Sequence, residues 1–311
     1  GKAMTLDAAE IDRAYQFFLG RTPPADKRPP FASTAQLYAA LIDAPEFKAG
    51  KRSQKTKMKW PLGQAFVLPQ ARLICCAIPG SGGDALAAHM VRLSGHPDSD
   101  YILRDVDLLT AHVNTGLRLG DHPKPQARAY ADAPDFMRLA VLRAPRDRLL
   151  AVWRTQFQRD RHLSQYHAAT GPVMAAIQGQ DRPDFHRSVC FADFVRHVAA
   201  AKPGTLAPDW RPQHLFLRGM TYTHLFDYGR RDAALAAMTA WADSRLPAPD
   251  IGTNPPSAQA DVPGAHAMEP PVLDALPDVQ ARCFFDETLD ARIAQSFARD
   301  IALLEKAAHA A

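Results

Sequence analysis

The stretch RLICCAIPGSGGD, residues 72–84, decides the fold expected for this chain. Arg72 to Ile78 is a short apolar run, typical of a strand buried on both faces of a sheet. A glycine-rich turn, Pro79 to Gly83, closes the run, and a helical pattern continues from Asp84 to Leu93. The backbone N–H groups at such a turn lack partners within the helix, and the helix dipole favours an anion there. The sequence therefore predicts a phosphate-binding loop.

A second interpretation of the loop stays open, because Asp84 could simply cap or charge the start of the helix after a tight turn. The pattern Gly-x-x-x-x-Gly-Lys-Ser/Thr is absent, and no lysine occurs between Lys59 and Lys124, which disfavours a P-loop kinase or NTPase. The glycines also lack the Gly-x-Gly-x-x-Gly spacing of dinucleotide-binding folds.

A second strand-to-helix unit follows. Met137 to Leu142 is another buried apolar run, and it leads through Arg143 into a helical pattern from Arg146 to about Gln165. Two such units predict an α/β fold with a parallel sheet flanked by helices. Because both junctions open on the same edge of a parallel sheet, we expect Arg143 and Arg148 to converge with Gly80 to Gly83 on one phosphate-sized site.

Composition limits the possible classes of protein. The chain has 311 residues, of which 47% are hydrophobic and 23% charged, enough for one large domain and a small appendage. No apolar run reaches the roughly 18 residues that span a bilayer. The four cysteines are too few for a disulfide scaffold, and the adjacent Cys75 and Cys76 lie in an apolar run. We therefore expect a reducing, cytoplasmic location.

Basic residues are concentrated in one segment. The chain has 37 Lys and Arg against 33 Asp and Glu, and six of the basic residues, with no acidic one, lie within residues 48–59. The remainder is close to neutral, which disfavours a nucleic-acid partner, because such proteins spread cations along a whole face. The segment is either a solvated linker or a peripheral contact for an anionic partner.

Apolar residues at helical spacing in Asp7 to Phe18 and in Thr34 to Ile42 predict a small helical domain over residues 4–50. A basic linker, residues 51–69, and a main domain, residues 70–308, follow.

Other elements of the main domain are expected from helical periodicity and from proline content. Helices are predicted over residues 191–201, 231–244 and 289–308. Eight prolines between Pro247 and Pro277 predict an irregular segment that covers the surface with at most short helical turns.

Several of these segments resemble sulfotransferase motifs. VLRAPRDRLL, residues 141–150, is similar to the segment Val-Arg-Asp-Pro-x-x-Arg-Leu-x-Ser, and residues 79–84 stand where that family has a Pro-Lys-x-x-Ser/Thr-Thr loop. FADFVRHV at 191–198, DWRPQ at 209–213 and FFDETL at 284–289 resemble, in order and spacing, stretches of Golgi-type carbohydrate sulfotransferases. The resemblance spans roughly residues 70–308 and suggests a bacterial, cytoplasmic member of that group.

The small N-terminal domain has a resemblance of its own. Residues 14–21 and 41–47 are similar to the signature Y-x-x-x-L-G-R … L-x-x-S-P-E-F of a helical domain of unknown function. That domain often accompanies bacterial carbohydrate-active enzymes. An amphipathic helical pair that only packs on the main domain is an equal alternative.

The sulfotransferase resemblance implies a P-loop-like sulfotransferase fold and a nucleotide donor, 3′-phosphoadenosine 5′-phosphosulfate (PAPS), with no metal. The residues implied in donor binding are Pro79, Gly80, Ser81, Gly82, Gly83, Asp84, Arg143 and Arg148. The implied acceptor is a glycan or glycan precursor, with Trp210, Arg211 and Gln213 on the acceptor side. Asp209, His214 and His89, in that order, are the candidates for the base that takes the proton of the acceptor hydroxyl.

The chain departs from the family pattern at six positions: Gly80 stands at the loop lysine, Gly83 and Asp84 at the hydroxyl positions, Ala144 at the aspartate of Arg-Asp-Pro, Ala151 at the serine, and Asp209 at the histidine before Trp. An arginine such as Arg146 or Arg72 could replace the lysine. A non-catalytic binding or assembly module with a degenerate cofactor site is therefore the main alternative to an enzyme, and a nucleotide-dependent kinase is a third.

Overall fold

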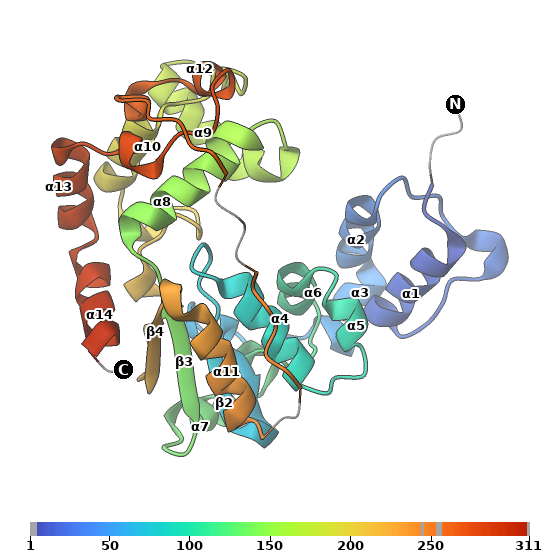
Figure 1. Ribbon diagram of the computed structural model, residues 1–311. Coiled ribbons are helices and arrows are strands. Elements are labelled where there is room, and N and C mark those ends of the chain that lie inside the picture. The colour runs from blue at the N-terminus through green and yellow to red at the C-terminus, as the bar shows by residue number, and fades with distance from the viewer. Residues whose placement is uncertain (1–4, 244–245, 253–256, 310–311) are drawn as a thin grey trace.

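The computed structural model describes residues 5–243, 246–252 and 257–309, and its centre is a four-stranded sheet (Figure 1). The strands are β1 (Phe66–Leu68), β2 (Leu73–Cys76), β3 (Met137–Leu142) and β4 (His224–Asp227), in the order β1-β2-β3-β4. β2, β3 and β4 are parallel, and β1 pairs antiparallel with β2. The α/β fold expected from the two strand-to-helix units is confirmed, with a mixed, mostly parallel sheet.

Both faces of the sheet are buried, as the continuous apolar runs predict. Leu73 and Cys75 of β2 belong to the core on one face, whereas Ile74 and Cys76 belong to cores on the other. β3 alternates in the same way, because successive side chains of a strand point to opposite faces. Its six residues are all buried.

Helices cover each face. On one face α4 (Gly83–Leu93) packs against β1 and β2, and α11 (Arg231–Trp241) packs against β3 and β4. On the other face lie α7 (Lys124–Asp132) and α14 (Ala298–His309), the latter against β4. This layering places the end of β2 and the end of β3 beside each other.

A separate helical lobe follows β3 and lies above the sheet in Figure 1. It contains α8 (Pro145–Trp153), α9 (Ser164–Gln178), α10 (Phe191–Ala200), α12 (Pro270–Asp274) and α13 (Glu287–Ser296). Its core is aromatic, with Trp153 packed on Phe191 and Phe284 at ring-centroid distances of 5.7 and 5.6 Å. The Trp153 indole N–H donates to the Val189 carbonyl over 3.0 Å.

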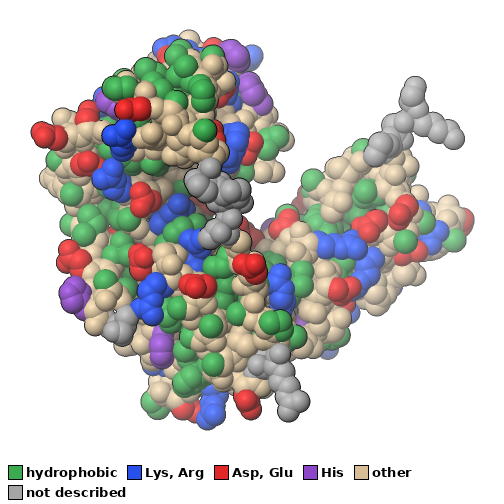
Figure 2. Space-filling model, in the orientation of Figure 1, with side chains coloured by type: hydrophobic (Ala, Val, Ile, Leu, Met, Phe, Trp, Pro, Cys, Tyr) green, Lys and Arg blue, Asp and Glu red, His purple; other side chains and the backbone are tan. Residues whose placement is uncertain are grey.

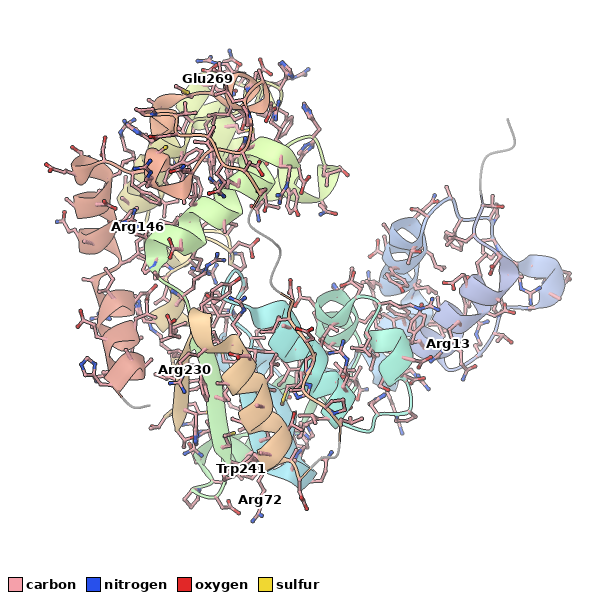
Figure 3. The ribbon with its side chains drawn as sticks, viewed as in Figure 1. Arg13, Arg72, Arg146, Arg230, Trp241 and Glu269 are labelled. Atoms are coloured by element: carbon pink, nitrogen blue, oxygen red, sulfur yellow. The ribbon has the colours of Figure 1, made fainter. Side chains whose placement is uncertain are left out.

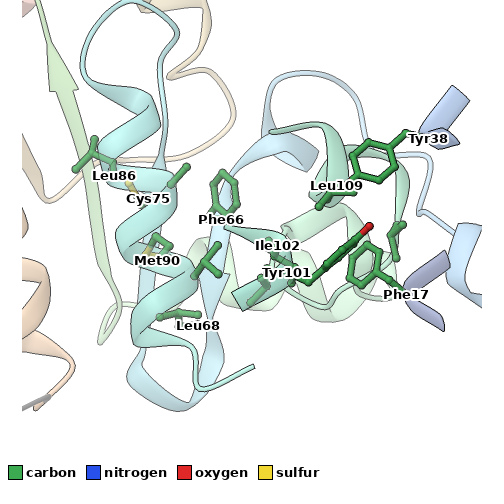
Figure 4. Close-up of a cluster of buried hydrophobic side chains, with 14 of the residues drawn as sticks. Phe17, Tyr38, Phe66, Leu68, Cys75, Leu86, Met90, Tyr101, Ile102 and Leu109 are labelled. Atoms are coloured by element: carbon green, nitrogen blue, oxygen red, sulfur yellow. The ribbon is translucent and has the colours of Figure 1, made fainter. Parts of the chain in front are cut away.

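The N-terminal unit consists of α1 (Ala8–Leu19), α2 (Thr34–Asp43) and α3 (Pro45–Ala49), which stand at one side of the molecule in Figure 1. It packs on α5 (Ser99–Ile102) and α6 (Val106–His112) of the main domain. The Phe17 and Tyr101 rings lie beside each other (Figure 4), with centroids 5.1 Å apart, and Arg13, labelled in Figure 3, pairs with Asp98 at 3.0 Å. The cores of the two parts form one continuous cluster.

Several predicted boundaries were wrong. The helix expected to reach Gln165 changes at Arg154 into a π-helical turn that ends at Arg159, and the helix expected over residues 289–308 is divided between α13 and α14 at Phe297. Residues 66–68, predicted as linker, form β1. Three residues are too few for strand periodicity to show.

The proline-rich segment agrees with its prediction. In the described part of residues 247–277 the helical elements are a turn at Ala265–Ala267 and α12, five residues long. Ser244 of the predicted helix 231–244, Met4 of the predicted N-terminal domain, and residues 253–256 lie outside the described residues.

Charged side chains of both signs are interspersed on the face shown in Figure 2. In the segment 48–59, Lys48 pairs with Asp43, Arg52 donates to the Phe17 carbonyl, and Lys55 pairs with Asp121. Half of this basic run is therefore held by contacts within the protein. Among the described helices, none combines the length and apolarity that crossing a bilayer requires.

The shared core predicts that the N-terminal unit and the main domain unfold together. Phe17→Ala should lower the free energy of unfolding by about 3–5 kcal/mol, because Phe17 is 2% exposed and packs between the two parts. Chemical denaturation followed by circular dichroism should show one transition in both proteins. A separate early transition in the variant, with the main transition unmoved, would contradict a common core.

Candidate functional site

The glycine-rich loop joins β2 to α4 in a conformation that requires glycine. Gly80 and Gly82 have φ values of +77° and +76°, in the left-handed region that other residues avoid. Gly82 precedes α4 without a side-chain cap, so the N–H groups of the first turn remain free for a ligand. The loop therefore has the backbone geometry of an anion-binding turn.

Arg143 meets this loop from the end of β3. Its guanidinium Nη1 donates to the Gly80 carbonyl over 3.2 Å and stacks on the Tyr228 ring at 4.1 Å. Its Nε is buried and has no hydrogen-bond partner in the described part of the chain. One donor of this cation beside the loop is therefore without a partner in the described protein.

Arg231, at the start of α11, adds a second cation. Its guanidinium stacks on the same Tyr228 ring at 3.6 Å, and Nη1 donates to the Tyr228 carbonyl over 3.0 Å. Its side chain also packs on Gly82, where a Cβ would lie 2.9 Å from Cδ of Arg231. Sequence reasoning missed Tyr228 and Arg231, because no motif marked the segment after β4. We call Arg143, Tyr228 and Arg231 the cationic flank of the loop.

Arg148 also reaches the loop, so both arginines contact it, as expected, whereas a shared phosphate site stays a prediction. Its side chain is 2% exposed and donates to the carbonyls of Pro79, Arg211 and Pro208 over 2.9, 2.5 and 3.2 Å. Burial lowers the pKa of Arg148 to about 10, against the opposing effect of Asp300 and Asp209. The guanidinium is therefore used to join the loop to residues 208–211.

Gln213 connects the same parts from the other side. Its amide accepts from the Ser81 hydroxyl and the Arg143 N–H over 2.7 and 2.9 Å, and donates to the Arg143 carbonyl over 2.7 Å. Its own backbone N–H donates to Asp300 over 2.7 Å. The side chain is fully buried.

The other residues predicted on the acceptor side lie nearby. Trp210 is 2% exposed and packs on Phe157 and Phe194 at 5.5 and 5.4 Å. Arg211 is partly exposed and lies over the Trp60 ring at 4.6 Å. Of the DWRPQ stretch, the Trp and Gln side chains thus face the interior, and Arg211 faces Trp60.

A cavity of about 540 Å³ opens beside the loop, and we call it the loop cavity. Pro79, Gly83 and Asp84 line it on the loop side and Asp209 on the opposite segment, and α6 adds Asp107. None of the three residues of the cationic flank lines it. Arg104 and Arg118 also line the cavity, so its walls carry charges of both signs, with four Asp residues against two Arg.

Asp84 has no hydrogen-bond or ion-pair partner among the described residues. Burial raises its pKa, and the nearby carboxylates of Asp107, Asp209 and Asp105 raise it further. The dipole of α4 favours a negative charge at this position and would lower the pKa of Asp84. Because the pKa is raised instead, burial and the repulsion from the neighbouring carboxylates outweigh the dipole.

Asp209 is held by Gln156. The Gln156 amide donates to Oδ2 of Asp209 over 2.5 Å and accepts from the Trp210 indole N–H over 3.1 Å. Gln156 is buried and lies in the π-helical turn Arg154–Arg159, a feature often found at functional sites. Sequence periodicity could not reveal this residue, because a π-helical turn follows no 3.6-residue pattern.

The two histidine candidates lie elsewhere. His89 is buried between α4 and α11, with Nε2 2.7 Å from the Thr239 hydroxyl, and burial lowers its pKa. His214 has Nδ1 3.0 Å from Asp300 and faces a different cavity. Of the three predicted bases, Asp209 lines the loop cavity.

The two arginines suggested as substitutes for the missing lysine are also engaged elsewhere. Arg146 lies over the Phe285 ring at 4.0 Å and is 3.4 Å from Asp290. Arg72, labelled in Figure 3, precedes β2 at the end away from the loop, and it pairs with Asp135. Arg143 takes the position at the loop instead.

Comparison with known proteins gives one match. The model of a family described as the sulfotransferase family matches residues 63–238, which include the loop, the cationic flank, Gln156 and Asp209. Neither the curated proteins nor the solved structures gave a match.

The raised pKa of Asp84 predicts an effect on stability. Ionised Asp84 costs stability at neutral pH, and the cost disappears as the pH falls through its pKa in the folded state. Asp84→Asn should therefore be more stable than wild type at pH 7, by less than about 1 kcal/mol because the side chain, although partly desolvated by its neighbours, is still exposed to solvent. The difference should vanish near pH 4 and below.

Thermal unfolding across this pH range tests the prediction, with Asp181→Asn, an exposed position of the helical lobe, as the control. A loss of stability at pH 7 in Asp84→Asn alone would mean that the favourable interaction of the carboxylate with the dipole of α4 prevails.

Proposed function

The chain belongs to the sulfotransferase family, and from this premise we propose that it transfers a sulfuryl group from PAPS to a carbohydrate hydroxyl. One observation carries the proposal: the guanidinium groups of Arg143 and Arg231 stack on one Tyr228 ring beside a glycine loop that opens a helix. Such an arrangement suits the phosphates of a nucleotide, because arginine offers paired donors to phosphate oxygens.

The donor set at the loop fits PAPS in three respects. The first turn of α4 offers uncapped N–H groups, Arg143 has a buried Nε without a partner, and the Tyr228 ring is fixed between cations. Arg148 and Gln213, which the resemblance placed at the donor and acceptor, are assigned positioning roles, because their polar groups bind the protein itself.

When bound, PAPS would supply the sulfuryl group: the acceptor oxygen would bond to sulfur as the bond from sulfur to the 5′-phosphate oxygen breaks, which releases 3′-phosphoadenosine 5′-phosphate. The N–H groups of α4 and the guanidinium of Arg143 stabilise negative charge beside the loop. Asp209, aimed by Gln156, accepts the proton of the acceptor hydroxyl in the loop cavity. Asp84 lines the same cavity.

The missing lysine has a structural counterpart. At Gly80 the backbone has a positive φ, and a Cβ would lie 3.2 Å from Cγ of Arg148, so a lysine would be strained there. Arg143 contacts the Gly80 carbonyl and supplies a cation at the same loop. This substitution favours the enzyme over a binding module that has lost its donor site.

We further propose a bacterial surface glycan or its precursor as the acceptor, and a cytoplasmic location. The carbohydrate acceptor rests on the similarity of residues 191–198 and 209–213 to carbohydrate sulfotransferases. The four cysteines are unpaired and buried, which suits a reducing compartment.

Calorimetry with 3′-phosphoadenosine 5′-phosphate tests the donor site. We expect micromolar binding by wild type and a loss of roughly 10- to 150-fold in Arg143→Ala and in Arg231→Ala, because each removes a charge-assisted contact of about 1.5–3 kcal/mol. Arg182→Ala, an exposed arginine of the helical lobe, should bind like wild type.

If the wild-type protein does not bind the nucleotide at millimolar concentration, the chain would share the fold of sulfotransferases but not their donor site. Binding without any sulfate transfer to a panel of glycans would favour the non-catalytic module.

Transfer of label from radiolabelled PAPS to glycans tests the base. Asp209→Asn should lower kcat by about 10²- to 10⁴-fold with little change in nucleotide affinity, because only proton transfer is lost. Gln156→Leu should lower kcat less, since it leaves the carboxylate but removes the donor that aims it. The base would have to be reassigned if Asp209→Asn kept full activity.

A further inference from the structure

Trp60 occupies an unusual position on the surface of the protein. It is 39% exposed, and it lines the loop cavity as well as two further cavities of about 620 and 520 Å³. Phe216 packs edge-on at 5.0 Å, and the Arg211 guanidinium lies over the ring at 4.6 Å. The indole is therefore held in a fixed orientation at the junction of three hollows.

The two further cavities share Trp60 and Arg218, and we call them together the basic groove. Six Lys and Arg residues line it: Lys59, Lys124, Arg128, Arg211, Arg218 and Arg299. No Asp or Glu lines it within the described residues. The groove is thus cationic in a protein whose charges are otherwise nearly balanced.

Most of these cations are free. Lys59, Lys124, Arg218 and Arg299 are exposed and have no ion pair or hydrogen bond in the described part of the chain. Elsewhere arginines form pairs readily, as Arg21 does with Glu46 at 2.6 Å and Arg28 with Asp12 at 2.7 Å. Unpaired cations that surround a fixed indole indicate a ligand with negative charges and a flat apolar face.

We propose that the basic groove binds an acidic oligosaccharide, as a subsite for the part of the acceptor beyond the reacting sugar. The proposal rests on the proposed function, which places the reacting hydroxyl in the loop cavity. A sugar ring presents C–H groups on one face, which pack on the Trp60 indole, while its carboxylate or sulfate groups pair with Arg218 and Arg299. Trp60 lines both the basic groove and the loop cavity and so connects the two.

The assignment distinguishes the groove from the donor site. No residue of the glycine loop and none of the cationic flank lines the groove. A mononucleotide bound at the loop would not contact the cations of the basic groove. We therefore assign these cations to a different anion. The reaction that installs acidic groups on the acceptor must then precede sulfation.

Titration calorimetry on the full chain tests the subsite with a galacturonic acid hexamer and a neutral maltohexaose as probes. We expect the uronate to bind at least about tenfold more tightly than the neutral hexamer, with an affinity that falls as salt is added. Arg218→Glu and Arg299→Glu should each weaken uronate binding about tenfold or more, and Trp60→Ala should weaken both saccharides.

Matched controls separate these effects from damage to the fold. Arg182→Glu reverses the charge of an exposed arginine outside the groove, and Trp241→Ala removes an exposed tryptophan, labelled in Figure 3, whose indole N–H donates to the Arg72 carbonyl. Both should bind the uronate like wild type. All variants should keep their affinity for 3′-phosphoadenosine 5′-phosphate, because the donor site is elsewhere.

Equal binding of the uronate and the neutral hexamer would overturn the proposal. Tighter binding of anionic lipid vesicles or of a single-stranded oligonucleotide through the same residues would also overturn it. If the protein binds the uronate as expected but does not bind 3′-phosphoadenosine 5′-phosphate, the proposed role of the groove would be supported and the proposed sulfotransferase activity would be refuted.

Discussion

The site depends on the burial of one amide. Gln213 binds the Ser81 hydroxyl and both backbone groups of Arg143, and thereby fixes the two strand-to-helix loops to each other. Asp300 of α14 receives the N–H groups of Gln213 and His214 and holds this segment in place. A buried polar group that loses its hydrogen-bond partner destabilises the folded state. None of these contacts can therefore be broken without a cost to the groups that share it. The glycine loop, the end of β3 and the last helix are therefore positioned as one unit.

The sequence predicted those parts of the molecule that follow a short-range pattern. β2 and β3 are continuous apolar runs, and the glycines at 80, 82 and 83 mark the turn, so the fold class and the meeting of Arg143 with the loop could be expected. β1 and β4 could not, because β1 has three residues and β4 is bounded by the polar His224 and Asp227, so neither forms a continuous apolar run like that of residues 73–78. The break at Phe297 carries neither Gly nor Pro, and for that reason one long helix was expected.

The roles of side chains were harder to predict than their places. Arg148 and Gln213 look like ligand-binding residues in sequence, yet burial directs their polar groups to the protein. Arg231 and Gln156 carried no signal, because their importance comes from neighbours such as Gly82 and Asp209 that lie far away in the chain. A motif gives the order of residue types along the chain. The direction in which a charged side chain points depends on tertiary contacts, which the motif does not contain.

The contribution of Asp300 has a consequence for the way the site forms during synthesis. The sheet can pair once β4 has left the ribosome, but the carboxylate that holds the Gln213 segment is made much later in the chain. Until α14 docks against β4, the glycine loop and the end of β3 lack their common anchor. A nascent chain that ends before Asp300 therefore lacks both the carboxylate that holds the Gln213 segment and the helix that covers this face of the sheet, so the site is among the last parts of the molecule to be assembled.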